Sequence, residues 1–127
     1  MDSFGRLLKA YREQAGLTQR GLARASGVNS AIVSRLESDD RAPSGPAQVL
    51  ALARALRLAP ADTDRLLAAA GLWPQVFLAV GPDDPSLLAV ARLLASERVD
   101  ARAKACLRRL IDDLAGYWLA EPAEERA

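Results

Sequence analysis

The sequence contains no histidine and a single cysteine, Cys106, among its 127 residues. One cysteine cannot form an internal disulfide, and a structural zinc site needs a cluster of cysteine and histidine that this chain lacks. Adjacent aspartates occur at 39–40, 83–84 and 112–113, where solvated turns, caps and a polar helix face explain them. We therefore predict no enzymatic activity, no bound metal and no cofactor, and a reducing cytoplasm as the location.

Aromatic residues are also scarce, at 5% of the chain, whereas hydrophobic residues make up 50% and are mostly alanine and leucine. This composition favours helices and disfavours strands, so we predict an all-α fold without a sheet. Charges are scattered through residues 1–16, which excludes both a signal peptide and a membrane span there. We expect a soluble protein that does not associate with membranes.

The net charge of +1 hides an asymmetry between the two halves of the chain. Residues 1–57 hold nine basic and five acidic side chains, whereas the chain from residue 73 onward holds seven basic and nine acidic ones. A polyanionic partner, if there is one, belongs with the N-terminal half. Differences of this size also arise by chance, so the charge balance alone is weak evidence for a polyanionic partner.

The segment 18–37, TQRGLARASGVNSAIVSRLE, has two helical hydrophobic periodicities that are separated by Gly27. Thr18 is placed to cap the first helix, Gly27 to form the turn, and Asn29 or Ser30 to cap the second helix. Two short helices joined by a tight turn form a helix-turn-helix motif. The second helix of such a motif lies in the DNA major groove, with its first residues toward the base edges.

The remaining helices follow from periodicity and from the positions of glycine and proline. Before the motif, a helix over 3–14 ends at Gly16, and after it Pro43 and Pro46 confine 38–46 to a loop. We predict a fourth helix around 49–56, and a fifth that opens at Asp62 or Thr63, after an interruption at Pro60, and runs to Gly71. The resulting boundaries are a bundle over 1–72, a partly packed hinge with one helical turn over 73–85, a helical region over 86–120 and a disordered tail over 121–127.

Two helices are expected in the C-terminal region, from Ser86 to about Glu97 and from about Asp100 to Leu119. Two helices alone cannot bury their apolar faces, so this region needs a partner surface. Pairing with a second copy is the preferred interpretation, and folding back on the N-terminal bundle is the alternative. The predicted homodimer interface consists of Leu87, Val90, Leu94, Leu107, Leu110, Ile111, Leu114 and Trp118.

Residues 4–72 resemble the DNA-binding domain of the Cro/CI-type repressors, also called the XRE family. The similarity rests on REQAGLTQRGLARASGV followed by VSRLE and by Pro43-Ser44. It implies a five-helix, lambda-repressor-like domain that binds double-stranded DNA. It also implies an internal ion pair between Arg12 and Glu37, which ties the first helix to the end of the third.

The same resemblance implies a set of DNA contacts. Gln19 matches a glutamine that anchors a phosphate, and Ile32 either touches thymine methyl groups or packs against the protein itself. Arg35 is placed to bind a guanine or a phosphate, or it is a solvated helix charge. The predicted contact set is Thr18, Gln19, Asn29, Ser30, Ala31, Ile32, Ser34, Arg35, Arg41 and Ser44.

One feature departs from the family pattern, because Asp39 and Asp40 stand where basic residues commonly approach phosphate. Unless they are turned away or capped, these acids repel the DNA backbone, so we expect weak non-specific affinity and a shallow salt dependence.

The sequence therefore favours a homodimeric, sequence-specific transcriptional repressor on an inverted repeat, located in the cytoplasm with the nucleoid. Its C-terminal helices would carry regulation, through a regulatory protein partner, cleavage or a ligand. The alternative is an antitoxin-like module that binds a partner protein through its C-terminal half.

Overall fold

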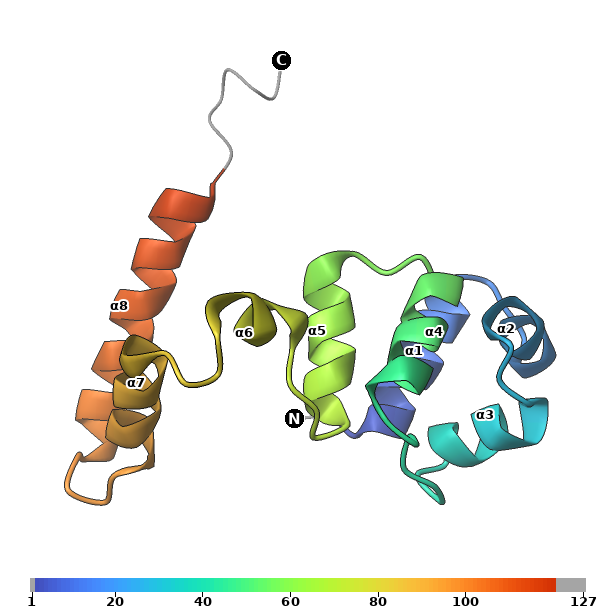
Figure 1. Ribbon diagram of the computed structural model, residues 1–127, viewed down its shortest axis with the longest axis horizontal. Coiled ribbons are helices and arrows are strands. Elements are labelled where there is room, and N and C mark those ends of the chain that lie inside the picture. Colours follow the sequence, from blue (N-terminus) through green and yellow to red (C-terminus); the bar gives the residue numbers. More distant parts are fainter. Residues whose placement is uncertain (1, 121–127) are drawn as a thin grey trace, which may run out of the picture. The chain divides into compact units, whose positions relative to one another are not determined.

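We analysed a computed structural model that describes residues 2–120 of the chain. This part of the chain contains helices and no strand, as the composition predicts (Figure 1). It divides into two compact units with the boundary between Gly81 and Pro82. None of the described helices combines the length and apolar character needed to cross a bilayer.

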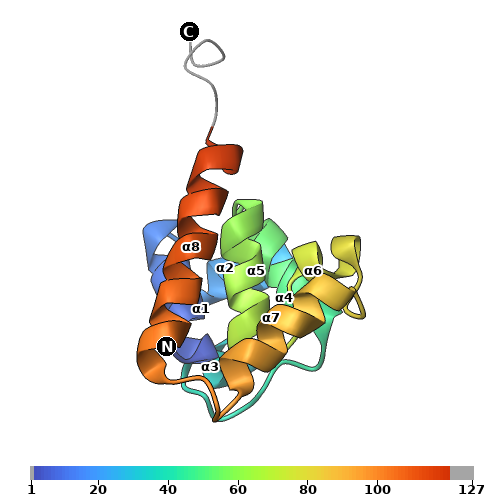
Figure 2. The same ribbon diagram turned by 90° about the vertical axis from the view of Figure 1, so that its left-hand side faces the viewer.

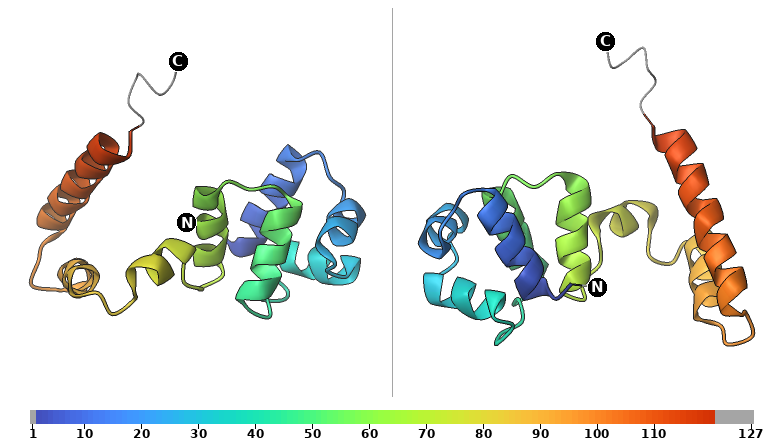
Figure 3. Two further views of the ribbon diagram at one scale, coloured as in Figure 1. Left: turned by 45° about the horizontal axis from the view of Figure 1, so that its top comes forward. Right: turned by 180° about the vertical axis from the view of Figure 1, so that it is seen from behind.

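The first unit begins with five helices: α1 (Phe4–Gln14), α2 (Gln19–Ser26), α3 (Ser30–Glu37), α4 (Pro46–Ala55) and α5 (Pro60–Ala69). Helix α1 packs against α3 and α5, and α4 packs against α2 and α5. Helices α2 and α3 lie together at one end of this group, and α5 lies at the other (Figures 1 and 3). The helix-turn-helix pair is therefore supported from behind by α1 and α4.

The core of the first unit draws on all five of these helices. Its fully buried side chains are Leu8, Leu22, Val33, Leu36, Val49, Leu52, Leu66 and Leu67. This set includes Leu22 on α2 together with Val33 and Leu36 on α3. The apolar positions of the helix-turn-helix motif therefore anchor it to the bundle. Burying a leucine side chain contributes roughly 1.5–3 kcal/mol, so the motif's position is fixed by the core.

Helix α5 begins earlier than predicted, because Pro60 is its first residue and Ala59 is its N-cap. Proline suits the first position of a helix, where no intrahelical bond uses its missing N–H, and its fixed φ is already helical. Our interpretation of Pro60 as an interruption was therefore wrong. Pro46 has the same role at the start of α4, after Gly45.

The segment that follows α5 forms a helix of six residues, α6 (Gln75–Val80), which belongs to the first unit. Asp64 on α5 accepts a hydrogen bond from the Gln75 amide at 2.8 Å, which fixes the start of α6. Trp73 and Phe77 pack edge to face, with ring centroids 5.8 Å apart. Trp73 nevertheless remains 60% exposed, so this segment is only partly packed.

The second unit contains α7 (Pro85–Ala95) and α8 (Ala101–Leu119), joined by a loop from which the two helices diverge (Figure 2). Asp84 caps α7, and Asp100 caps α8 by accepting from the Ala103 amide at 2.7 Å. No residue of either helix is buried in the described chain.

Candidate nucleic-acid interface

Local capping sets the geometry of the helix-turn-helix pair. The Thr18 hydroxyl accepts a hydrogen bond from the Gly21 amide at 3.0 Å, and the Asn29 carboxamide oxygen accepts from the Ala31 amide at 2.8 Å. Between the two helices Gly27 adopts a left-handed conformation, with φ of 76°, which a residue without a Cβ adopts at little cost. These short-range interactions orient α3 relative to α2.

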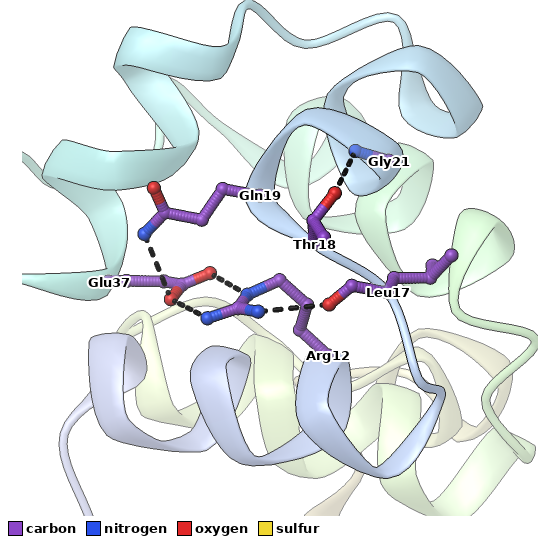
Figure 4. Close-up of polar contacts among 6 residues, drawn as sticks. All are labelled: Arg12, Leu17, Thr18, Gln19, Gly21 and Glu37. Carbon is purple, nitrogen blue, oxygen red and sulfur yellow. Dashed lines mark hydrogen bonds and ion pairs between the residues drawn. The ribbon is translucent and has the colours of Figure 1, made fainter.

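An internal ion pair fixes the far end of α3 (Figure 4). The Arg12 guanidinium donates from Nε to Glu37 Oε2 at 2.6 Å and from Nη2 to Glu37 Oε1 at 2.9 Å. Its Nη1 donates to the Leu17 carbonyl at 2.9 Å, so one side chain joins α1, the start of the motif and α3. The hydrogen bonds to Glu37 raise the pKa of Arg12, which keeps the guanidinium charged.

Gln19 completes this cluster, since its Nε2 donates to Glu37 Oε1 at 3.3 Å (Figure 4). A carboxamide nitrogen carries two hydrogens, so one remains for a second acceptor. Gln19 thus braces α3 while it keeps a donor available.

A depression lined by Lys9, Gln19, Ser34 and Ser38 opens next to this cluster. Lys9 was not among the residues we predicted, because it lies on α1, outside the motif.

The edge of α3 that faces away from the core is exposed and carries four of the predicted contact residues: Ser30, Ala31, Ser34 and Arg35. We call these four residues the reading edge. Ile32 lies apart from it, because its side chain is half-buried and packs against the hydrophobic core. This packing agrees with the interpretation that Ile32 supports the fold.

The two acids after α3 are held by the protein itself. Asp39 adopts a positive φ of 61°, and its Oδ1 accepts a hydrogen bond from the Gly5 amide at 2.9 Å. Gly5 lies in the first turn of α1, where the helix dipole favours a negative charge. Asp40 accepts from the Ser38 hydroxyl at 3.0 Å. The carboxylate of Asp39 therefore stabilises the start of α1, so this acid has a role within the fold.

The loop before α4 holds two residues of the predicted contact set, Arg41 and Ser44. The Ser44 amide donates to the Gln48 side chain at 3.0 Å. A phosphate would have to displace Gln48 to use it. Arg41 is exposed and has no carboxylate within ion-pair distance among the described residues.

Comparison with known proteins adds two findings. A family model described as a helix-turn-helix domain matches residues 3–66. The HTH-type transcriptional repressor RghR of Bacillus subtilis (strain 168) is 45% identical over 58 residues, which are 46% of this chain and 43% of that repressor. The chain therefore spans less than half the length of this curated relative.

No solved structure matches the chain significantly. The matched region 3–66 contains the capped turn, the Arg12–Glu37 ion pair and the reading edge. The chain belongs to the helix-turn-helix domain family.

Proposed function

We propose that this protein is a sequence-specific DNA-binding regulator of transcription that acts as a repressor, with α3 in the major groove. The observation that carries the proposal is the reading edge: four small or basic side chains are exposed on a helix whose other face is held by the core and by Glu37. A rigid helix with one free polar edge is suited to base recognition. The similarity to the transcriptional repressor RghR supports the same function.

The chemistry of the reading edge sets what it recognises. Serine hydroxyls at 30 and 34 both donate and accept hydrogen bonds, so they tolerate several base edges, and Ala31 suits a thymine methyl group. Arg35 supplies the selective contact, because a guanidinium binds the O6 and N7 atoms of guanine with two hydrogen bonds. We therefore expect each recognised half-site to contain one guanine that contributes strongly to affinity.

Phosphate contacts follow from donors that remain free around α2 and α3. The Thr18 hydroxyl and the Asn29 carboxamide use their oxygens as acceptors in the caps, which leaves their hydrogens to donate outward. Gln19 keeps one N–H, and Arg41 is exposed. Such contacts set the position of a protein on the duplex without reading its sequence.

Dimerisation is part of the proposal, since a single reading edge of small residues makes few specific contacts. Four of the residues that we predicted to pair two copies, Leu110, Ile111, Leu114 and Trp118, are 40–74% exposed on α8. The other four, Leu87, Val90, Leu94 and Leu107, are half-buried. We infer that the exposed set pairs with a second copy, and that the dimer reads an inverted repeat.

The test is the selection of bound duplexes from a random pool by the full chain. Arg35→Ala is selected in parallel, and Arg54→Ala, which removes an exposed arginine from α4, serves as the control. We expect the wild type and the control to enrich one inverted repeat with a guanine in each half-site, and Arg35→Ala to lose the preference at that guanine. Failure of the wild type to enrich any sequence would contradict the proposal.

An antitoxin-like module that binds a partner protein is the second candidate. The exposed apolar residues of α8 favour it as much as they favour a homodimer, because a partner protein would cover them equally well. Co-expression and purification separate the two. A small protein that remains bound in stoichiometric amount supports the antitoxin-like module, whereas a purified homodimer that binds DNA supports the repressor.

A further inference from the structure

We propose that Arg20 and Arg24 on α2 form a second phosphate-binding surface, next to the N-terminal end of α3. This inference rests on the proposed function and extends it to two residues outside the predicted contact set. The ligand is the backbone of the same DNA duplex that the reading edge contacts.

The two arginines are arranged as a pair. They are four residues apart on α2, so they lie on the same side of the helix about one turn from each other. Both are exposed, and together with Gly27, Asn29 and Ser30 they line a depression between α2 and the start of α3. Two flexible cations at one depression can each reach a phosphate of the same backbone.

The charge of this pair is not balanced by the protein. Within residues 2–120 the ion pairs are Arg12–Glu37 and Arg65–Asp62, so neither Arg20 nor Arg24 has a carboxylate within 4.0 Å. The sequence contains no aspartate or glutamate between Glu13 and Glu37. Like charges one turn apart repel each other, and phosphates bound to the two arginines would relieve the repulsion.

The position of the depression identifies the anion as phosphate of the duplex. The depression extends to Asn29 and Ser30, at the start of the helix that we place in the major groove. This groove is only about 12 Å wide and is bordered by a phosphate backbone on each side. Groups beside the end of a helix in the groove therefore meet one of these backbones.

A second depression supports the same assignment. It is lined by Lys9 and Gln19 and extends to Ser34 and Ser38, toward the C-terminal end of α3. Cationic side chains thus accompany both ends of the reading edge. Two phosphate backbones border the groove, and the chain offers positive charge beside each end of the helix that would enter it.

The experiment measures the affinity of the full chain for the selected duplex and for a shuffled duplex of equal length, over a series of salt concentrations. The variants are Arg20→Ala, Arg24→Ala, the double variant and Arg24→Lys, with Arg54→Ala as the matched control. Alanine favours a helix, so the variants keep α2 intact, which circular dichroism verifies.

Each phosphate contact contributes about 0.9 to the slope of log affinity against log salt concentration. We expect each single alanine variant to reduce the magnitude of the slope by about that amount on both duplexes, and the double variant to reduce it by about twice as much. Arg24→Lys should retain the wild-type slope because lysine binds phosphate as a point charge. Slopes for Arg20→Ala and Arg24→Ala equal to those of the wild type and Arg54→Ala would overturn the inference and leave the proposed function intact. A wild type that binds neither duplex would overturn both.

Discussion

The side chains of Arg12, Gln19 and Glu37 hold α3, and with it the reading edge, in a fixed position relative to α1. Arg12 makes three hydrogen bonds from α1, two to Glu37 and one to the Leu17 carbonyl, while Gln19 adds a third hydrogen bond to Glu37. The Arg12 and Glu37 side chains are only 12% and 4% exposed. Because both charges are largely removed from water, each depends on the other, and the pair defines where α3 ends relative to α1.

Replacing Arg12 by alanine should destabilise the protein strongly. The substitution leaves the Glu37 carboxylate buried without its partner, which costs about 3–5 kcal/mol of unfolding free energy. Urea unfolding measures this loss, and Lys9→Ala, an exposed neighbour on α1, is the control with little expected change. A loss below about 1 kcal/mol, the value typical of surface pairs, would show that the pair is not essential to the fold.

Tyr11 provides a pH test of the packing between α1 and α5. Burial and the hydrogen bond that its hydroxyl donates to Asp62, at 3.1 Å, raise its pKa above the ordinary 10.0. The neutral phenol is therefore favoured in the folded state, so its stabilisation is fully present below pH 10.0 and is lost as the pH rises through the folded-state pKa.

As the pH rises above 10.0, we expect the unfolding free energy of the wild type to fall more steeply than that of Tyr11→Phe, which has no ionisable hydroxyl. Urea unfolding at several pH values compares the two. Parallel curves for the two proteins would contradict the altered pKa of Tyr11.

At the scale of helices and loops, the turn after α3 is coupled to the start of α1. Asp39 bonds to the Gly5 amide, and a Cβ added to Gly5 would lie 2.6 Å from the Leu36 carbonyl oxygen. The glycine is therefore required by the close approach of the two backbones. This contact sets the direction in which the chain leaves α3.

Gly5→Ala should separate α1 from the end of α3 and lower the unfolding free energy by about 1–3 kcal/mol, as over-packing does in protein cores. Gly116→Ala on α8 is the matched control, because a Cβ there meets no atom within 4 Å. Thermal unfolding should show a lower transition temperature for Gly5→Ala, and an unchanged or higher one for Gly116→Ala. Equal transition temperatures would exclude the close approach.

The features that were predictable from sequence are those set by neighbours in the chain. The caps and turn of the motif, formed by Thr18, Gly27 and Asn29, involve partners within four residues, so the helix-turn-helix pair was predicted with its caps. Pro60 was ambiguous, because a proline that ends one helix and a proline that begins another have the same local sequence. The environment of Asp39 could not be predicted, since its partner Gly5 is 34 residues away.

The same distinction holds for the candidate site. The reading edge followed from helical periodicity and from the family resemblance, whereas the depressions that include Lys9, Arg20 and Arg24 depend on how separate helices pack. An arginine on a helix surface looks solvated in the sequence. Only its position beside the start of α3 makes it a candidate contact.

At the scale of the whole molecule, the two units differ in how they are stabilised. The first has a core of leucines and valines that is closed to solvent, while no residue of α7 or α8 is buried. Exposed apolar side chains on α8 include Leu110, Leu114 and Trp118. In our account a second copy covers them, and the paired copies bring two reading edges to one inverted repeat.

Leu114→Glu should therefore dissociate the protein and weaken its binding to the inverted repeat, because the substitution introduces two charges at the centre of a two-fold interface. Sedimentation velocity measures the mass, and Asp113→Ala, an exposed residue next to it in sequence, is the control. We expect a monomer for Leu114→Glu and dimers for the wild type and the control. A wild type that sediments as a monomer at micromolar concentration would contradict the homodimer.

The central claim is that the exposed edge of α3 reads a DNA sequence. The most direct measurement compares the affinity of the full chain for the selected inverted repeat and for a shuffled duplex of the same length and composition, at one salt concentration. The account predicts an affinity for the inverted repeat that is higher by about a thousandfold or more. Equal affinities for the two duplexes would show that the protein binds DNA only through its charge, and would contradict the claim.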